Sequence, residues 1–393
     1  MSEVAIPGDD GQGKPCVLFV DLDGSLVTTD LLFEHVFVLI KQKPWCAPLL
    51  LWWLRLGRAG LKDEVARRVT IDPTTLPYND AVLTQIQQLR DDGTLLVLAT
   101  AAPRAWADAV ANHLGLFEAV LATEPGRNLK GLGKLNAIRA FCRDRGLVHL
   151  DYLGDAAPDI VIWSNARRAY VVSPSRQLVR RLQKHLPPSV EVCLLGPSRR
   201  PLLAAINALE PAGWLKNLLV FLPWVLSGRW NDPSAAGSVI LAFLAMGLAT
   251  SSVGILQSLM ELATDRLHPI RRQRSFASGQ LPLTWGPPMI VGLMSASLLL
   301  AATTLPVTTL AAVIGFGSLA MMAAILIRES SSLGMLITLL LDFLRLQVGA
   351  SALHTEPTAA MIIIVTALSL TLSGLRRASP PSQATPHHSR PAS

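Results

Sequence analysis

The stretch Val17-Leu18-Phe19-Val20-Asp21-Leu22-Asp23-Gly24-Ser25 places two aspartates and a glycine directly after four apolar residues. A short apolar run that contains β-branched residues is typical of a buried strand. One carboxylate after such a strand can act as a nucleophile and the second as a proton donor, while the glycine allows a sharp turn. We therefore predict a strand over residues 17–20 that ends in two candidate catalytic residues, Asp21 and Asp23.

Two further candidate residues follow short apolar runs in the same way. Thr100 comes directly after residues 95–99, and Asp155 follows residues 150–153 and a glycine. Strands that alternate with helices are typical of an α/β doubly wound parallel sheet, in which ligands bind beyond the carboxyl ends of the strands. Asp21, Thr100 and Asp155 are thus expected to meet at one edge of the sheet. A further strand is predicted over residues 169–172, and helices over residues 104–114 and 133–145.

Two lysines and another aspartate complete the set of groups that phosphoryl transfer requires. Lys130 and Lys134 both precede or open the next predicted helix, and Lys134 is the preferred phosphate ligand because it leads that helix. Asp159 follows Asp155 closely enough to support the same metal ion. An ammonium and a hydroxyl group would offset the charge of the phosphoryl oxygens. The alternative is that these acids cap strand ends and form turns, as aspartate often does.

The four motifs, in this order and spacing, resemble those of the haloacid dehalogenase-like (HAD) hydrolases, phosphatase branch, over residues 16–185. The resemblance implies that Asp21 attacks phosphorus and forms an aspartyl phosphate, and that Asp23 protonates the leaving oxygen and then activates water. It also implies that Thr100 and Lys134 hold the phosphoryl oxygens, with Lys130 as the competing candidate. Mg²⁺ is the implied cofactor, held by Asp21, Asp23 through its backbone carbonyl, Asp155 and Asp159.

Residues 31–85 interrupt the alternation of strands and helices and are expected to form a helical cap over the site. This segment contains Trp45, Trp52 and Trp53, followed by a basic face. One interpretation rests these tryptophans on the membrane interface, where tryptophan is enriched. The other packs them against the sheet, because the apolar face of an amphipathic helix is usually core.

The composition predicts that the second half of the chain is a membrane domain. The chain has 393 residues, of which 50% are hydrophobic and 16% are charged, and residues 275–327 include no charged side chain. These values are extreme for a soluble protein, and the length suits two domains. We expect a disordered leader (1–15), a HAD-like domain (16–196), a linker (197–212), a membrane domain (213–377) and a disordered tail (378–393). Six spans are predicted, over residues 215–228, 236–260, 283–303, 306–327, 333–353 and 358–375.

The distribution of basic residues predicts how the chain crosses the membrane. Lys216, the cluster from Arg266 to Arg274, Arg328 and the pair Arg376–Arg377 fall at alternate ends of the predicted spans. The positive-inside rule then places the N-terminal domain and the C-terminus in the cytoplasm, and we expect an integral protein of a bacterial inner membrane. The basic residues behind the net charge of +7 are interpreted as topology signals and as contacts for anionic lipids. Nucleic acid is therefore not an expected partner.

The second half resembles the UbiA family of intramembrane prenyltransferases, in the branch of decaprenyl-phosphate phosphoribosyltransferases. The resemblance rests on Trp214–Asn217, Asp265–Pro269 with Arg272 and Arg274, and Ala277–Gly279. It implies two acidic motifs that hold Mg²⁺ on the phosphates of the substrate. In this chain both are depleted, because Gln257 and Glu261 stand in the first motif beside Asp265, and Gly334 stands where the second has an aspartate. The chain also stops before further helices that the family has.

The charged groups of this degenerate site have alternative interpretations. Lys216 and the cluster from Arg266 to Arg274, which includes Arg272, either receive a lipid phosphate or orient the protein. Asp342 and Arg345 lie one helical turn apart inside a predicted span. Because a charge at mid-bilayer is costly, they are expected to pair or to face a cavity, unless Arg345 reaches the interface.

Three hypotheses follow. The first is a membrane-tethered, Mg²⁺-dependent phosphohydrolase that acts through an aspartyl phosphate, on a polyprenyl-linked or sugar phosphate. The second is a UbiA-type transferase of prenyl or phosphoribosyl groups, acting on a polyprenyl lipid. The third is a membrane protein without enzymatic activity that binds a polyprenyl phosphate.

Overall fold

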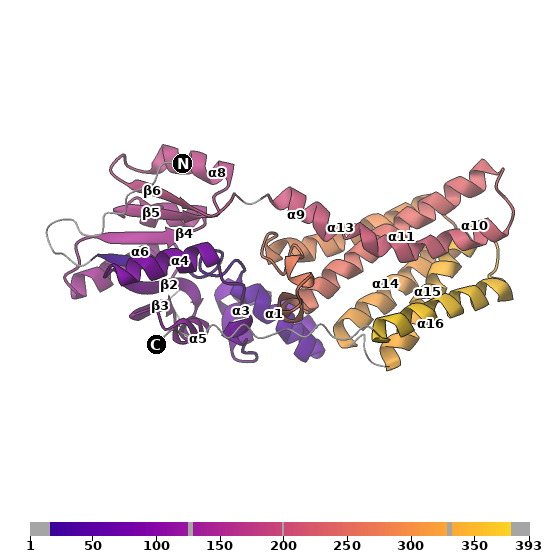
Figure 1. Cartoon of the computed structure of the whole chain (residues 1–393), viewed down its shortest axis with the longest axis horizontal. Coiled ribbons are helices and arrows are strands. Elements are labelled where there is room, and N and C mark those ends of the chain that lie inside the picture. The colour runs from indigo at the N-terminus through magenta and orange to yellow at the C-terminus, as the bar shows by residue number, and fades with distance from the viewer. Residues whose placement is uncertain (1–15, 125–128, 199, 328–331, 379–393) are drawn as a thin grey trace. The chain divides into compact units, whose positions relative to one another are not determined.

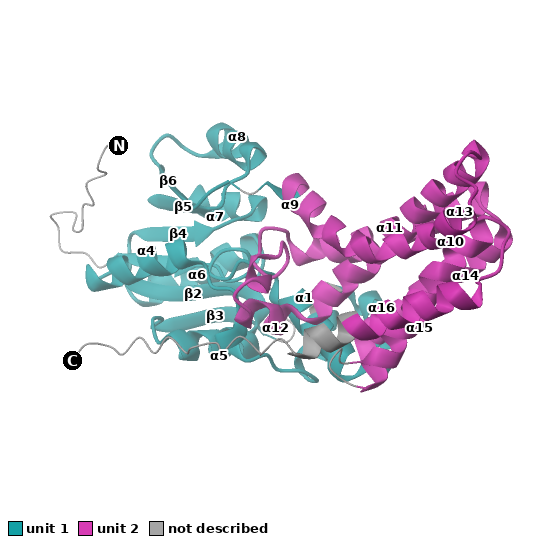
Figure 2. Ribbon diagram, turned by 45° about the vertical axis from the view of Figure 1, so that its right-hand side comes forward, with its two compact units in different colours: residues 1–201 teal, residues 202–393 magenta. Residues whose placement is uncertain are grey.

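The computed structural model describes residues 16–124, 129–198, 200–327 and 332–378. The chain divides into two compact units, Met1–Pro201 and Leu202–Ser393 (Figure 2). The expectations for residues 1–15, Arg328 and residues 379–393 fall outside the described residues, as do the side chains of Arg376 and Arg377.

The first unit contains a six-stranded parallel sheet with the strand order β3-β2-β1-β4-β5-β6, which is visible from bottom to top in Figure 1. All neighbouring pairs are parallel. The predicted α/β doubly wound sheet is therefore confirmed. The strands are β1 (Val17–Val20), β2 (Leu95–Pro103), β3 (Ala119–Thr123), β4 (Leu150–Gly154), β5 (Arg168–Val172) and β6 (Glu191–Leu195).

Helices cover both faces of this sheet because the side chains of β1 alternate between two cores. Leu18 and Val20 belong to one apolar cluster, which includes residues of α4 (Asp80–Asp91) and α5 (Arg104–Leu114). Val17 and Phe19 belong to the other, which includes residues of α6 (Leu132–Asp144), α7 (Ile160–Trp163) and α8 (Arg176–His185). This two-faced burial explains why the central strands read as continuous apolar runs.

The register of the central strands brings the candidate residues to one edge. Val20 is paired with Leu98 of β2 and with Leu153 of β4. The residues that follow these three positions therefore lie at the same carboxyl edge of the sheet, as the sequence predicts.

The segment between β1 and β2 forms the expected helical cap. It consists of α1 (Leu31–Gln42), η1 (Pro44–Cys46), α2 (Ala47–Trp53), η2 (Leu54–Leu56), α3 (Gly57–Ala66) and η3 (Pro73–Thr75), before α4. Trp53 is 6% exposed and packs in the core, but Trp45 is 70% and Trp52 61% exposed. The core interpretation of the tryptophans is thus right for Trp53 and wrong for the other two.

The second unit is helical, and four of its described helices are long and apolar enough to cross a membrane. These are Pro233–Met260 (α11), Leu283–Thr304 (η7 and α13), Val307–Leu326 (α14) and Ser332–Ala352 (α15). The first predicted span falls instead on η5 (Pro211–Phe221) and the short α10 (Leu222–Leu226), and the sixth falls on α16 (Ala359–Ala378). The span Leu283–Thr304 consists of η7 (Leu283–Trp285) and α13 (Gly286–Thr304). The remaining elements of this unit are α9 (Pro201–Ala208), α12 (Leu262–Leu267) and η6 (Arg271–Gln273). Helix α9 occupies part of the predicted linker.

Candidate functional site

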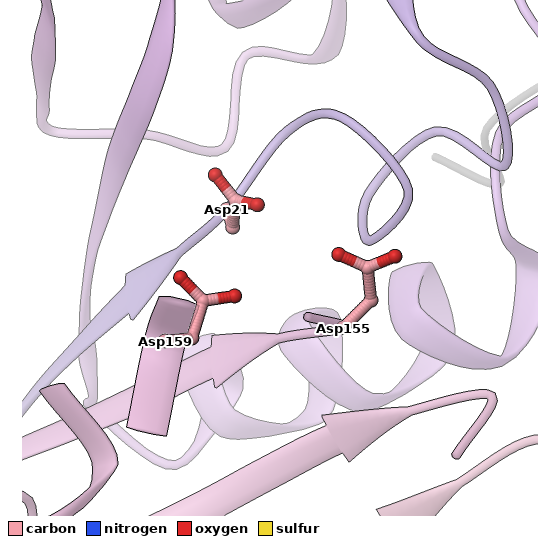
Figure 3. A group of neighbouring side chains, drawn as sticks. All are labelled: Asp21, Asp155 and Asp159. Carbon is pink, nitrogen blue, oxygen red and sulfur yellow. The ribbon is translucent and has the colours of Figure 1, made fainter. Parts of the chain in front are cut away.

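Three carboxylates from separate segments converge at the carboxyl edge of the sheet. Asp21 follows β1, and its backbone N–H donates to the carbonyl oxygen of Leu153 at 2.9 Å, which fixes it beside the end of β4. Asp155 follows β4, and Asp159 ends the short helix η4 (Ala157–Asp159). One carboxylate oxygen from each of the three lies within 4.8 Å of the others (Figure 3).

Lys134 is the cation that this carboxylate group holds. It is 4% exposed, and its Nζ donates to Oδ1 of Asp21 at 2.7 Å and lies 4.0 Å from Oδ1 of Asp159. Burial alone would lower the pKa of Lys134, but the carboxylates of Asp21 and Asp159 together outweigh that effect, so its pKa is raised. Lys130 lines the same cavity but is exposed. The structure therefore favours Lys134 over Lys130 as the charged partner of Asp21.

Tyr152 connects Lys134 to Asp159, and it is not among the residues predicted for the site. Its hydroxyl accepts a hydrogen bond from Nζ of Lys134 at 2.9 Å and donates to Oδ1 of Asp159 at 3.0 Å. The residue lies within the apolar run of β4, where a tyrosine reads as part of the core. Its position two residues before Gly154 was the one available signal, since side chains near the end of a parallel strand approach the ligand edge.

Asp23 lies in the turn after Asp21, next to the start of the cap. Its Oδ1 accepts a hydrogen bond from the N–H of Leu31 at 2.9 Å. Loss of solvation, with a smaller contribution from the charge of Asp30, raises the pKa of Asp23 to about 7. A carboxyl group with such a pKa carries a proton in part of the molecules near neutral pH, which is what a general acid requires.

These residues line one open cavity of about 360 Å³. The cap contributes Lys62 of α3, whose Nζ donates to the carbonyl oxygen of Ala101 at 2.8 Å. Thr100 is fully buried and does not line the cavity, although its neighbour Ala101 does. The Thr100 Oγ1 accepts a hydrogen bond from the N–H of Ala102 at 3.0 Å. The lining residues from the predicted set are Asp21, Asp23, Lys130, Lys134, Asp155 and Asp159.

The donor set of this cavity fits a hard divalent cation. Carboxylate oxygens are the ligands that Mg²⁺ prefers. Burial, and then the charge of Asp21, raises the pKa of Asp159 to about 6, which shows the electrostatic cost of gathering these groups. A cation bound by Asp21, Asp155 and Asp159 would remove that cost. Among the described residues, no other group of acidic, histidine or cysteine side chains has such spacing.

Asp265, Glu261 and Arg274, which belong to the predicted transferase site of the second unit, form ion pairs. Asp265 is fully buried, and its Oδ2 accepts from Nη1 of Arg274 at 3.0 Å. Arg271 approaches both Asp265 (3.4 Å) and Glu261 (3.6 Å), and Arg274 also contacts Glu210 at 3.1 Å. Gln257 and Lys216 are partly buried, and Arg272 is exposed. Arginines thus occupy the positions around Asp265 where a magnesium site needs further carboxylates.

The charged pair predicted inside α15 is present. Nη1 of Arg345 donates to Oδ1 of Asp342 at 2.7 Å, and Nε donates to Oδ1 of Asn217 at 3.0 Å. The guanidinium also lies over the ring of Phe316, 4.7 Å from its centroid. Arg345 is therefore held within the bundle and does not extend to the interface.

Comparison with known proteins gives partial relatives and no match to a family model. The chain is 31% identical over 271 residues to an uncharacterised protein, y4nM, of Sinorhizobium fredii, which covers 68% of this chain and 51% of that protein. It is 40% identical over 81 residues to the nodulation protein NoeC of Azorhizobium caulinodans (21% and 26%). It is 33% identical over 106 residues to the decaprenyl-phosphate phosphoribosyltransferase of Mycolicibacterium smegmatis (26% and 33%).

The chain spans about half the length of the first of these relatives and a third or less of the other two. The similarity to the transferase agrees with the resemblance predicted for the second unit. Similar solved structures include a Bordetella pertussis protein of unknown function, at 17% identity and a TM-score of 0.36 over 46% of this chain and 98% of that one. They also include a phospho-aspartyl intermediate analogue of phosphoserine phosphatase, at 14% identity and a TM-score of 0.33 over 48% and 98%.

Proposed function

We propose that this protein is a membrane-tethered phosphohydrolase that uses Asp21 as its nucleophile. The observation that carries the proposal is the convergence of Asp21, Asp155 and Asp159 around one cavity, with Lys134 buried against the nucleophile. A carboxylate nucleophile, a nearby acid and an ammonium group are the parts that phosphoryl transfer to an enzyme requires.

In the first step, an oxygen of Asp21 attacks phosphorus, and the bond from phosphorus to the ester oxygen breaks. The carboxyl group of Asp23 donates its proton to the leaving oxygen, and Asp21 becomes an aspartyl phosphate. In the second step, Asp23 takes a proton from water, which attacks the phosphorus. The bond from phosphorus to the Asp21 oxygen breaks, which releases inorganic phosphate and restores the Asp21 carboxylate. Lys134 holds Asp21 in place before attack, because the two groups form a buried ion pair.

Mg²⁺ is the proposed cofactor, and Asp21, Asp155, Asp159 and the backbone carbonyl of Asp23 would hold it. When bound, it would offset negative charge on the phosphoryl oxygens. Lys134 supplies further positive charge, and the hydroxyl of Thr100, whose neighbour Ala101 lines the cavity, is a candidate donor. The proposed substrate is a phosphate monoester carried on a sugar or a polyprenyl lipid, because the catalytic unit belongs to the same chain as a membrane unit.

Phosphate release by the full chain in detergent tests the proposal. With Mg²⁺, the wild type is expected to hydrolyse an aryl phosphate and to form an acid-stable, hydroxylamine-sensitive phosphorylated protein. Asp21→Asn keeps the shape but removes the nucleophilic charge, so it should abolish both. Asp91→Asn, at an exposed position, is the matched control. Equal phosphate release by the wild type and Asp21→Asn would end the proposal.

A second candidate function, transfer of a phosphoribosyl or prenyl group to a polyprenyl lipid, is favoured by the similarity to decaprenyl-phosphate phosphoribosyltransferase. The ion pairs of Asp265 with Arg274 and Arg271 weigh against a metal-dependent reaction at that position. Incorporation of labelled phosphoribosyl diphosphate into membrane lipid, abolished in Asp265→Ala, would support it. Tight binding of a polyprenyl phosphate without turnover in either assay would favour the third candidate, a binding protein without enzymatic activity.

A further inference from the structure

The cap exposes an apolar surface that its own unit leaves uncovered. This cap surface consists of side chains from η1, α2 and η2 that are 44–71% exposed, namely Trp45, Leu49, Leu51, Trp52, Leu54 and Leu56. Trp53 points into the core and anchors the segment. Exposed apolar side chains that gather on one short segment mark a site of contact with a membrane or another molecule.

We propose that the cap surface docks on the lipid bilayer in which the second unit is anchored. The proposal goes beyond anchoring by the spans, because it assigns a second membrane contact to the catalytic unit itself. Three features of the chain support the bilayer as the partner: the type of residue exposed, the charge around it, and the covalent connection to the second unit.

The residue types and charges of the cap surface fit a bilayer interface. Tryptophan is enriched at the level of lipid headgroups, because its ring is apolar and its N–H can still reach a polar group. Residues 41–58 contain four lysines and arginines and no acidic residue. The guanidinium of Arg55 lies over the ring of Trp52, 5.0 Å from its centroid, and both side chains are exposed. Positive charge beside exposed tryptophan and leucine favours anionic lipid over a basic protein surface.

The tether makes even a weak contact of this kind effective. The helices that can cross a membrane belong to the same chain, and β6 and α9 are joined by residues 196–200. A short connection raises the effective concentration of the catalytic unit at the bilayer, so docking is intramolecular once the spans are inserted.

Docking also bears on the substrate, in a step that rests on the proposed phosphohydrolase function. Helix α3 follows the cap surface directly and packs against α1 and α2. Its Lys62 lines the catalytic cavity. One small element thus carries both the cap surface and a cationic part of the cavity wall, which suits a phosphate monoester on a lipid headgroup better than one free in solution.

Quenching of tryptophan emission by brominated lipid tests the docking without reference to activity. The full chain is placed in nanodiscs of phosphatidylcholine and phosphatidylglycerol, with and without brominated acyl chains. The wild-type spectrum minus that of Trp45→Phe/Trp52→Phe isolates the two exposed tryptophans, and phenylalanine keeps the cap surface apolar. If the cap docks, this difference emission is blue-shifted and at least twofold weaker in brominated discs. A red-shifted difference emission of equal strength in both discs overturns the proposal.

A charged variant links docking to substrate delivery. Leu51→Glu/Trp52→Glu changes two exposed side chains, so folding should be preserved, and Val148→Glu changes one that is 65% exposed elsewhere on the same unit. We expect the double variant to lose at least tenfold in hydrolysis of phosphatidic acid and polyprenyl phosphate in nanodiscs, while aryl phosphate hydrolysis stays within twofold. Val148→Glu should retain both activities. If no substrate is hydrolysed by the wild type, the proposed function fails and the quenching result still decides docking. If brominated lipid does not quench the difference emission and the double variant dissociates a dimer that the wild type forms, the cap surface binds a second copy of the chain. That result would overturn the proposal.

Discussion

Gly24 approaches Asp155 so closely that a β-carbon on the glycine would lie 2.2 Å from Oδ2 of the aspartate. Gly24 also has a φ of +80°, which a residue with a side chain adopts at a cost. The turn after Asp21 and the carboxylate of Asp155 after β4 therefore fix each other's positions. A side chain at Gly24 must displace a residue that we assign to the metal.

Gly24→Ala separates this close approach from simple backbone strain. Because Asp155 would have to move by an ångström or more, we expect about a 100-fold loss of phosphate release. Gly93→Ala is the matched control, since Gly93 has a φ of +86° and nothing within 4 Å of its would-be β-carbon. Both variants should lose about 1 kcal/mol of stability from the strained φ. Similar activities in the two variants would show that the contact with Asp155 is unimportant.

Tyr152→Phe removes one hydroxyl that holds Lys134 and Asp159 together. We expect roughly a tenfold lower kcat and a weaker apparent affinity for Mg²⁺, as is usual when a group that orients metal ligands is lost. Titration of activity with Mg²⁺ measures both. Tyr170→Phe, which changes another tyrosine buried in the sheet, should leave the Mg²⁺ dependence as in the wild type. An unchanged titration for Tyr152→Phe would reduce the tyrosine to a packing role.

The residues found from the sequence and those missed differ in where their side chains lie. The central strands were predicted because burial on both faces leaves a continuous apolar run. The edge strands β3 and β6 were not predicted, although residues 119–122 and 192–195 are apolar runs. Such a run normally indicates burial, but β6 lies at the edge of the sheet and exposes Val192 and Leu194.

Asp21 and Asp155 could be found because each directly follows a central strand. Tyr152 and Lys62 could not, because one lies inside an apolar run and the other on a cap helix far away in sequence. Only the folded chain brings Lys62 to the cavity. The sequence also could not decide whether Trp45 and Trp52 are exposed, since a short apolar helix has the same composition whether its outer face meets protein or lipid.

His35 predicts a loss of local stability in mild acid. It is buried and stacked on Trp106, with ring centroids 3.7 Å apart, and its Nδ1 contacts the carbonyl oxygen of Leu31 at 2.7 Å. Burial lowers the pKa of His35 from 6.5 to about 4. Between these values the unfolded chain binds a proton that the folded chain does not, so the stability is fully present above the unfolded pKa and decreases as the pH falls toward 4.

From this shift we expect the unit to be about 2 kcal/mol less stable at pH 5 than at pH 7 because of His35 alone. Hydrogen exchange of the backbone amides of α1 and α5 in the full chain, corrected for the intrinsic effect of pH on exchange, measures the opening free energy. His35→Phe retains an aromatic ring against Trp106 but cannot titrate, so its opening free energy should change by about 2 kcal/mol less over the same range. An identical pH dependence in the two proteins would contradict the assignment.

The final prediction concerns the ion pair between Asp342 and Arg345 in the second unit. Both are almost fully buried, at 3% and 6% exposure, and their ion pair extends through Asn217 to Thr250. Removing one partner leaves a charge in an apolar bundle, so Arg345→Met should cost about 3–5 kcal/mol. Replacing both residues removes the unpaired charge, and Asp342→Leu/Arg345→Met should therefore recover most of that loss. Thermal unfolding in detergent, followed across the wild type, both single variants and the double variant, measures the coupling. If instead the two single losses simply add, the pair does not act as a unit, and Arg345 must owe its place in the bundle to Asn217 and Phe316.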